Sequence, residues 1–221
     1  MGSFYGLSKY FSYGIVAKAK ELGYDESNIL LLAGEETLFR DRYPEVYNSL
    51  LSCIHHRDNR TPFEYGRDLV ASWVFEDCVI QSLRESELDV THNGADKNRK
   101  ILQDGQVMSD SDAMVHINGK DIPIEIMCDY TGFWSRRGVI DLRDNKYQKL
   151  KETNSLFLGF STTDDVLITI DFSKEIKVNY IQSHKPYGGK PCWSVLLHPE
   201  YIRTFTRQEV VDSVKELASN K

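Results

Sequence analysis

Apolar positions in the first part of the chain recur with helical spacing. The segment 7–22 ends before Gly23, and the segment 44–56 opens with Pro44, which suits the first turn of a helix. Few strand signals interrupt this pattern. We therefore expect an N-terminal helical region over residues 1–62.

A longer helical stripe follows between residues 63 and 86. Leu69, Trp73, Glu76 and Ile80 follow one another at spacings of four, three and four residues. Side chains at such spacings stack along one side of a helix. Glu76 is therefore expected on or beside an apolar helix face.

Beyond residue 88 the apolar positions alternate with a period of two, in short runs bounded by Gly, Asn and Asp. Asn118 and Gly119 supply the backbone angles of a tight turn, so the runs on either side predict a β-hairpin. Thr206 and Glu209 form a capping pair, which predicts the start of a last helix. The predicted strands are 88–94, 112–117, 122–130, 155–161, 166–172, 176–182 and 192–198, and the predicted helices are 140–153 and 207–219.

This order of elements predicts the fold class. Helices are followed by a strand, a hairpin, a further helix and more strands, and a mixed central β-sheet flanked by helices on both faces buries such a series. We expect an α/β (α+β) fold in which residues 63–221 form the core and its C-terminal helix. With 221 residues, this core and the N-terminal helical region of residues 1–62 are expected to form one compact unit.

Composition narrows the function classes only slightly. A formal net charge of −6 gives no global attraction to nucleic acid, so a polyanion would need a local basic patch. No apolar run approaches the roughly 18 residues of a membrane span, and no signal-peptide pattern opens the chain, so we expect a cytoplasmic protein without membrane contact. The cysteines lack paired spacing, which favours free buried thiols over a zinc site; they are Cys53, Cys78, Cys128 and Cys192.

Two carboxylates stand on the predicted hairpin strands. Asp112 begins the first strand and Glu125 lies late in the second, so the hairpin brings them near each other. The apolar residues around both acids indicate a covered part of the sheet, where an ionised group is costly unless it is paired. Each acid on its own reads as a solvated strand end, whereas the two together indicate a shared divalent cation. Oxygen ligands favour Mg²⁺, with Mn²⁺ as the second choice, over zinc.

The order of these features resembles the PD-(D/E)xK nuclease superfamily, which includes many restriction enzymes. The shared pattern is an acidic residue on a helix, an Asp at the start of one hairpin strand, a Glu in the next, and then a helix and a strand, over residues 63–172. The resemblance implies Mg²⁺-dependent hydrolysis of phosphodiester bonds. It also implies that Asp112, Glu125 and the carbonyl of Ile126 hold the metal, with Glu76 as an auxiliary acid.

The chain departs from the family pattern at Met127, which stands where the Glu-x-Lys tripeptide has its lysine. A methionine neither carries a charge nor orients a water molecule by donating a hydrogen bond. Lys146 on the following helix and Lys120 in the hairpin turn are two substitutes. Lys146 is favoured because its helix is expected to pack on the sheet directly after the strand of Glu125. A third reading is an inactive relative that has lost the lysine.

Basic and aromatic residues are concentrated after this strand. Segment 134–151 contains six basic and two acidic residues, a local charge of +4. The alternative role for the basic residues is a solvated helix face. The alternative role for Trp134 is to cover the core. The residues expected to contact substrate are Arg136, Arg137, Arg143, Lys149, Lys185, Lys190 and Trp134.

These features predict a Mg²⁺-dependent endonuclease of restriction or phage type that acts on double-stranded DNA. A cut through both strands would indicate a homodimer, since two strands need two sites. The alternative is a non-catalytic nucleic-acid-binding or assembly protein on a degenerate nuclease fold, motivated by Met127. A small-molecule enzyme or scaffold with an acidic surface is a third class, supported by the net charge.

Overall fold

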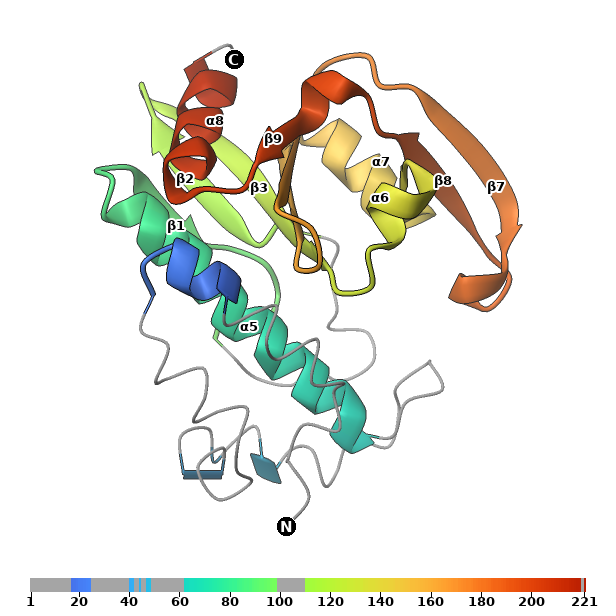
Figure 1. The fold of residues 1–221 in the computed structure, drawn as a ribbon, viewed down its shortest axis with the longest axis horizontal. Coiled ribbons are helices and arrows are strands. Elements are labelled where there is room, and N and C mark those ends of the chain that lie inside the picture. Colours follow the sequence, from blue (N-terminus) through green and yellow to red (C-terminus); the bar gives the residue numbers. More distant parts are fainter. Residues whose placement is uncertain are drawn as a thin grey trace.

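The computed structural model describes residues 17–24, 40–41, 44, 47–48, 62–98, 110–219 and 221. Among residues 1–61, those at 17–21, 40–41, 44 and 47–48 are helical, residues 22–23 form a turn after the first of these segments, and the remainder of the predicted N-terminal helical region, apart from residue 24, lies outside the described residues. From Pro62 onward the described chain is a mixture of helices and strands (Figure 1). This arrangement confirms the expected mixed α/β class.

A six-stranded mixed sheet forms the centre of the molecule. Its strand order is β1-β2-β3-β5-β6-β9, in which β3 and β5 run parallel and the other neighbours run antiparallel. A residue of β3 therefore has β2 on one side and β5 on the other. The strands are β1 (Asp89–His92), β2 (Ala113–Ile117), β3 (Lys120–Asp129), β5 (Leu156–Ser161), β6 (Val166–Asp171) and β9 (Ile202–Thr204).

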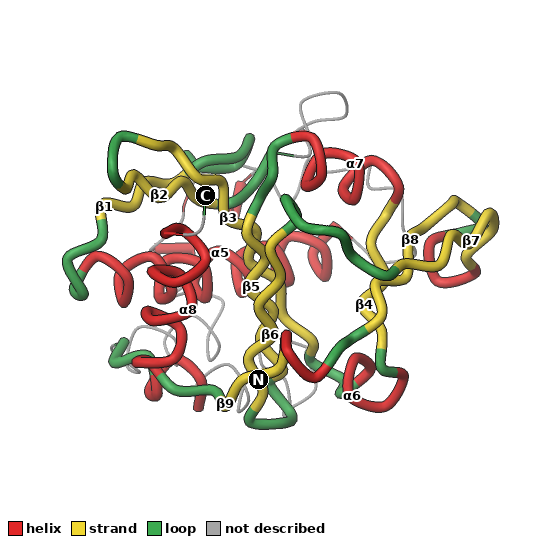
Figure 2. The backbone as a smooth tube through the Cα atoms, turned by 90° about the horizontal axis from the view of Figure 1, so that it is seen from above, coloured by secondary structure: helices red, strands yellow, loops and turns green. Residues whose placement is uncertain are grey.

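A three-stranded antiparallel sheet stands beside this centre. Its order is β4-β8-β7, and β7 and β8 form a hairpin closed by the short helix η1. The hairpin lies at the opposite side of the molecule from β1 and β2 (Figures 1 and 2). The elements are β4 (Val139–Arg143), β7 (Val178–His184), η1 (Lys185–Tyr187) and β8 (Lys190–Leu196).

Both faces of the central sheet are covered. Helices α5 (Pro62–Arg84) and α8 (Arg207–Ser219) supply one core, whereas α6 (Phe133–Arg137), α7 (Asp144–Glu152) and the second sheet supply the other. In Figure 2, β5 and β6 run between these two groups. A short helix, η2 (Pro199–Tyr201), leads into β9.

Alternation along β5 explains how one strand serves both cores. Leu156, Leu158 and Phe160 pack with α5 and α8, whereas Phe157 packs with the core on the other face. Successive side chains of a strand point to opposite faces of the sheet, which produces this division. Gly159 also faces the second core, because a Cβ atom there would lie 2.9 Å from the Trp134 ring.

The tight turn predicted between β2 and β3 is confirmed. Asn118 and Gly119 have φ values of 52° and 74°, and the residues on either side of them, Ile117 and Lys120, are paired in the ladder. Positive φ at both central positions matches the twist of the two strands. The turn therefore fixes which residues of β2 and β3 stand opposite each other.

The structure differs from the predicted elements in three places. Residues 140–143 belong to strand β4 instead of the start of a helix, because Ile140 and Leu142 alternate toward the second core; α7 begins at Asp144. Segment 131–139, where neither a helix nor a strand was predicted, contains the short helix α6, and β9 was not predicted. Both missed elements are short, so the sequence gives few periods by which to detect them.

The capping pair at the start of α8 is half formed. The hydroxyl of Thr206 accepts a hydrogen bond from the backbone N–H of Glu209 at 3.1 Å. The carboxylate of Glu209 lies 3.5 Å from Nε of Arg203, which precedes the helix on β9. A predicted helix start is thus correct, while its acidic member pairs with a neighbouring strand.

Candidate active site

The hairpin register places Asp112 beside Glu125. Ala113 pairs with Ile124 at the last position of the β2–β3 ladder, so the next residues outward on each strand are Asp112 and Glu125. The carboxylate of Asp112 turns toward β3, where its Oδ2 accepts a hydrogen bond from the N–H of Ile126 at 2.7 Å. The side chain of Asp112 thus takes a backbone N–H of β3 just beyond the point where the β2–β3 backbone pairing ends.

Lys146 of α7 contacts Glu125. Its Nζ lies 2.8 Å from both carboxylate oxygens of Glu125, and it also donates to the carbonyl of Asp110 at 3.4 Å. The Glu125 side chain is 5% exposed and that of Lys146 is 24% exposed. The contact between these two side chains is therefore largely shielded from water. A charge in such surroundings needs a partner.

Strand alternation explains why these two side chains meet. Glu125 stands opposite Phe157 on the neighbouring strand and shares its face of the sheet, which is the face covered by α7. The segment that crosses from β3 to the parallel strand β5 contains α7, so a lysine on that helix reaches the face toward which Glu125 points.

The surroundings of Glu125 favour its neutral form. Burial and the negative charge of Asp112 raise the pKa of Glu125 to about 8, against the opposing effect of Lys146. Two carboxylates that share one site cannot both ionise without cost. The single lysine therefore only partly offsets the accumulated negative charge.

Lys146 stays charged in this environment. Burial alone would lower its pKa, but the carboxylates of Glu125, Asp112 and Asp110 outweigh that effect and raise it. A permanent positive charge is therefore held next to two acids.

Two further acids lie close to the same part of β3. The charge of Asp96 contributes to the raised pKa of Glu125. The pKa of the Cys128 thiol is raised first by burial and then by the charges of Glu76 and Asp112. Glu76 of α5, predicted as an auxiliary acid, thus lies near Cys128, and α5 covers the face of the sheet opposite to that of Glu125 and α7.

Asp96 and Asp110 are the acids that sequence reasoning missed. Asp96 follows β1 in a turn, which read as a solvated surface segment, but it accepts a hydrogen bond from the indole N–H of Trp73. Asp110 lies just before β2, and its carboxylate is 3.1 Å from Nζ of Lys149. Asp110 could have been found because it is two residues before Asp112. Asp96 could have been found because it follows the end of β1, which pairs with the start of β2 next to Asp112.

Met127 and Lys120 have clear positions relative to the site. Met127 lies two residues beyond Glu125 on the same face of β3 and packs against the second core. Lys120 lies in the exposed first position of β3, next to the hairpin turn. Of the two lysines considered as substitutes for the motif lysine, the structure brings Lys146 to Glu125.

Asp129 takes a different role from the acids of the site. Its carboxylate accepts hydrogen bonds from the N–H and hydroxyl of Thr131, at 2.8 and 2.9 Å, and from the N–H of Trp134 at 2.7 Å. It therefore organises the segment that leads from β3 into α6.

The basic residues expected to contact substrate do not form one patch. Lys149 belongs to α7 together with Lys146, whereas Arg143, which directly precedes α7, places its guanidinium 5.3 Å from the centre of the Tyr187 ring of η1. Arg136 and Arg137 lie on α6, at the other end of β4 from α7 (Figure 2). The exposed Lys185 and Lys190 are on the β7–β8 hairpin, on the far side of the molecule from β1 and β2.

Trp134 belongs to the core instead of the substrate surface. Its side chain is buried, its ring centroid lies 6.2 Å from that of Phe157, and it closes over Gly159. This position agrees with the alternative of a core cap. A ring packed in this way is not available to stack on a base, which corrects its assignment as a substrate contact.

Comparisons with known proteins add no family to this description. A scan against protein-family models and a search of curated proteins found no match to the chain.

Within the described part of the chain, no helix is long and apolar enough to cross a membrane. The cysteines at positions 78, 128 and 192 are free thiols.

Proposed function

We propose that this chain is a metal-dependent endonuclease that hydrolyses phosphodiester bonds in double-stranded DNA. The observation that carries the proposal is the 2.8 Å contact between Nζ of Lys146 and the carboxylate of Glu125, next to Asp112. The resemblance to the PD-(D/E)xK superfamily requires two acids and a lysine at one point. Lys146 supplies that lysine from a helix, in place of Met127.

The donor atoms at this point suit a Mg²⁺ ion. Asp112 and Glu125 offer carboxylate oxygens, and the carbonyl of Ile126 is expected to face Asp112, because a strand residue directs its N–H and C=O to the same side. Such oxygen ligands match Mg²⁺ or Mn²⁺ better than zinc. When bound, the ion would lower the pKa of a water molecule and stabilise negative charge on the attacked phosphate.

In this proposal Lys146 has one role without the metal and another when the metal is bound. Without the metal its ammonium group contacts the carboxyl group of Glu125 at 2.8 Å. When Glu125 coordinates the metal instead, the ammonium group becomes available to the scissile phosphate, where it orients the attacking water and offsets charge. Asp96 adds negative charge near Glu125, which favours retention of a cation, and Glu76 adds negative charge farther along β3, near Cys128.

The substrate surface of the proposal is centred on α7. Lys149 of α7 can contact a phosphate beside the cleaved bond, and Arg143, over the Tyr187 ring of η1, can contact one farther along the strand. Lys185 and Lys190 lie at the tip of the β7–β8 hairpin, whose strand β8 packs on α7 through Trp193 and Tyr147, so they would contact DNA that extends from α7 along this hairpin. A double-strand cut would require two copies of the site, and therefore a homodimer.

Plasmid cleavage in Mg²⁺ tests the proposal. The wild type should cleave, and Asp112→Asn, Glu125→Gln and Lys146→Ala should each lower the rate by about 100-fold or more. Asp112→Asn keeps an oxygen that can accept the Ile126 N–H, so the hairpin should persist. Asp121→Asn, which changes an exposed acid of the same hairpin paired with His116 at 2.7 Å, is the matched control.

The outcomes separate the proposal from its alternative. Cleavage that survives all three substitutions, or that continues in EDTA, would remove the site assignment. DNA binding by the wild type without turnover in either Mg²⁺ or Mn²⁺ would favour the non-catalytic reading. In that case Met127→Lys should be tested for a gain of cleavage.

A further inference from the structure

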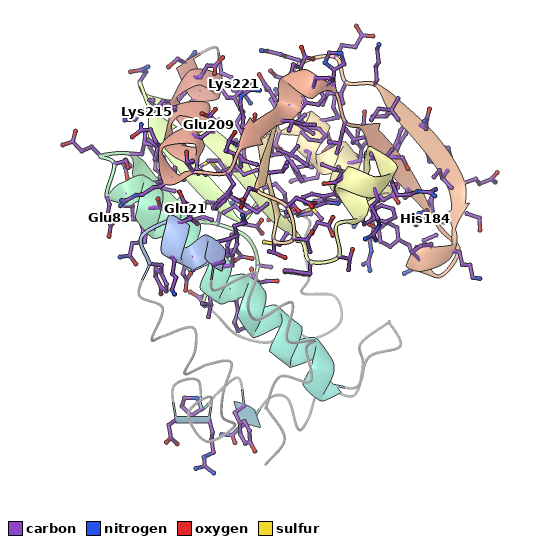
Figure 3. The ribbon with its side chains drawn as sticks, in the orientation of Figure 1. Glu21, Glu85, His184, Glu209, Lys215 and Lys221 are labelled. Carbon is purple, nitrogen blue, oxygen red and sulfur yellow. The ribbon has the colours of Figure 1, made fainter. Side chains whose placement is uncertain are left out.

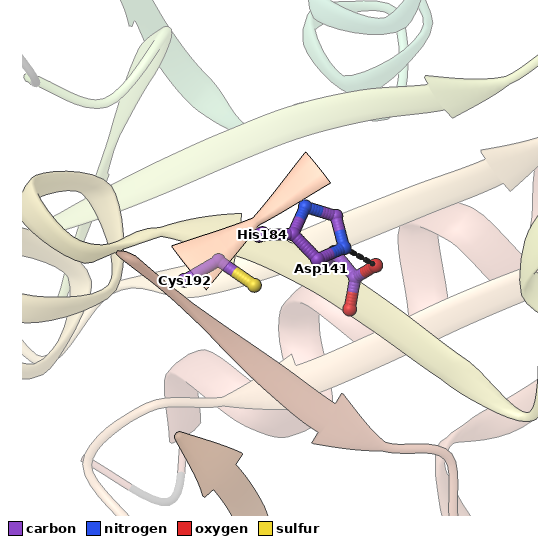
Figure 4. Close-up of side chains that lie close together, drawn as sticks. All are labelled: Asp141, His184 and Cys192. Atoms are coloured by element: carbon purple, nitrogen blue, oxygen red, sulfur yellow. Dashed lines mark ion pairs between the residues drawn. The ribbon is translucent and has the colours of Figure 1, made fainter. Parts of the chain in front are cut away.

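A second cluster of ligand-type side chains lies outside the proposed active site. Asp141 of β4, His184 at the end of β7 and Cys192 of β8 each direct one potential ligand atom inward, and these atoms lie within 4.8 Å of one another. Figure 4 shows the three side chains converging, with the dashed contact between His184 and Asp141. Figure 3 shows His184 at the β7–β8 hairpin, on the other side of the molecule from Glu85, which directly follows α5.

The strand register explains why these residues meet. Asp141 stands directly opposite Ser194, and Cys192 is two residues from Ser194, so the three side chains share a face of the sheet. His184 pairs with Lys190, again two residues from Cys192, after an irregularity in the β7–β8 ladder. One face of the small sheet thus collects a carboxylate, an imidazole and a thiol.

The cluster is enclosed. The side chains of His184 and Asp141 are 12% and 10% exposed, and Cys192 is buried. Tyr187 covers it from η1, since its hydroxyl donates to the carbonyl of Asp141 at 2.6 Å and its ring lies 4.9 Å from that of His184. The hydroxyl of Ser194 holds the other carboxylate oxygen of Asp141.

Hydrogen bonds account for only part of this arrangement. Nε2 of His184 lies 3.0 Å from Oδ2 of Asp141, but its Nδ1 is buried with no hydrogen-bond partner among the described residues. A buried ring nitrogen without a partner is unfavourable. Because Nε2 is the nitrogen that faces Asp141, the case for a ligand site rests on the convergence of a carboxylate, an imidazole and a thiol within 4.8 Å, and Nδ1 would not be the ligand atom.

We propose that Asp141, His184 and Cys192 bind one Zn²⁺ ion that links the three strands of the small sheet. Sulfur, nitrogen and oxygen ligands together suit zinc, whereas Mg²⁺ would favour oxygen ligands alone. The carboxylate and the thiolate balance the charge of the ion. A water molecule occupies the fourth position, because three side chains supply the protein ligands.

The distances are close to those of a zinc site. Ligand atoms about 2.0 Å from a tetrahedral ion are roughly 3.3 Å apart, and the imidazole nitrogen and carboxylate oxygen are already 3.0 Å apart. The sulfur lies within 4.8 Å and must approach by about 1 Å, a change that rotation of the Cys192 side chain can provide. On binding, the S–H bond breaks, a Zn–S bond forms, and the thiol proton leaves to solvent.

Cobalt spectroscopy tests this inference on the full chain. After treatment with EDTA and removal of the chelator, titration with Co²⁺ should produce a cobalt–thiolate absorption band in the near ultraviolet that saturates at one ion per chain. Zn²⁺ should then abolish the band. Cys192→Ser should remove it, and His184→Asn or Asp141→Asn should weaken Co²⁺ binding at least tenfold.

Control variants distinguish this site from other thiols and from other His–carboxylate pairs. Cys128→Ser, which changes the half-buried thiol near Asp112, should keep the full band. His116→Asn, which breaks the exposed pair between His116 and Asp121, should also keep it. Because the readout needs no DNA cleavage, its failure and the failure of the nuclease proposal remain distinguishable.

Thermal unfolding keeps the inference falsifiable if a variant folds poorly. The wild type should unfold at a higher temperature in excess Zn²⁺ than in EDTA, because a ligand that binds only the folded state stabilises it. A wild-type protein with no cobalt–thiolate band and no thermal shift would overturn the proposal. A band of unchanged amplitude in Cys192→Ser would also overturn it.

Discussion

Lys146 and Glu125 are 21 positions apart in the chain, yet the ammonium nitrogen of one lies 2.8 Å from the carboxylate of the other. The contact joins a helix to the central strand of the sheet at the point where Asp112 also arrives. In the lysine position of the Glu-x-Lys motif, the chain has Met127, which packs into the core instead. The positive charge of the site thus comes from a different element.

The first prediction concerns this change of element. Lys146→Ala should lower cleavage by about 100-fold or more, because no other lysine is described next to Glu125. In that background, Met127→Lys should recover part of the rate, since position 127 lies on the same face of β3 as Glu125. Rates of plasmid nicking in Mg²⁺ measure both effects.

Two results would contradict this prediction. Lys146→Ala with a wild-type rate would show that the ammonium group has no catalytic task. A Met127→Lys single variant that is faster than the wild type would indicate that Lys146 fills the motif position poorly. Circular dichroism of each variant confirms that the fold is retained.

The second prediction concerns the pH dependence of stability in the metal-free protein. The pKa of Glu125 is raised from 4.5 to about 8 by burial and by Asp112. A carboxyl with a higher pKa in the folded state contributes stability that is complete below pH 4.5 and is lost as the pH rises to about 8. Glu125→Gln should remove this loss, as measured by urea unfolding at several pH values.

The control for this prediction is Glu216→Gln on α8. Glu216 is exposed, so its substitution should leave the shape of the stability curve between pH 5 and about 8 unchanged. A wild-type curve that rises with pH over this range, and that Glu125→Gln does not alter, would mean that Glu125 is ionised throughout.

The third prediction concerns Gly159. A Cβ atom at this position would lie 2.8 Å from the Phe157 ring and 2.9 Å from the Trp134 ring. Gly159→Ala should therefore destabilise the protein by about 1–3 kcal/mol, the usual cost of overpacking a core. Chemical denaturation measures the loss, and adding Trp134→Leu should recover part of it by making space.

An additive effect of Gly159→Ala and Trp134→Leu would contradict the packing described for this face of β5. Two substitutions that share a contact are expected to be coupled, whereas independent sites add. The double-mutant cycle therefore tests the burial of Trp134 directly.

The fourth prediction concerns the surface that contacts DNA. Arg143→Ala and Lys149→Ala should each weaken binding and reduce the slope of log K against log salt by about 0.9 for each phosphate that the variant no longer neutralises. Lys185→Ala and Lys190→Ala should have smaller effects on short duplexes, because both lysines lie at the tip of the β7–β8 hairpin, outside the part of β8 around Trp193 that packs on α7. Binding to short and long duplexes in Ca²⁺, which should not support cleavage, measures both sets.

A short duplex whose affinity falls with Lys190→Ala but not with Lys149→Ala would place the DNA on the hairpin instead of on α7. That result would separate the basic residues from the acids of the proposed active site, and it would favour a binding role for the small sheet.

Strong local signals predicted much of the fold. The Asn118–Gly119 turn and the alternation on either side of it fixed the register that places Asp112 beside Glu125. Lys146 could be chosen over Lys120 because a helix that follows a strand packs on the sheet, whereas a turn residue faces solvent. These inferences needed only spacing and the connection between neighbouring elements.

Long-range pairing explains what the sequence could not reveal. Residues 140–143 fit a helix stripe and a strand equally well until β8 is present to pair with β4. Trp134 could cap the core or stack on a base, and only its contact with Phe157 decides between them. The cluster of Asp141, His184 and Cys192 depends on the register of three strands that are distant in sequence.

The parallel pairing of β3 with β5 has a consequence for the order of folding. The hairpin that unites Asp112 and Glu125 involves contacts close in sequence, whereas the first β3–β5 pair joins Ile124 to Leu156 across 32 positions. Contacts that close longer loops form more slowly. The two acids can therefore meet before Lys146 arrives, and a proton or a divalent cation that reduces their repulsion should speed the early step.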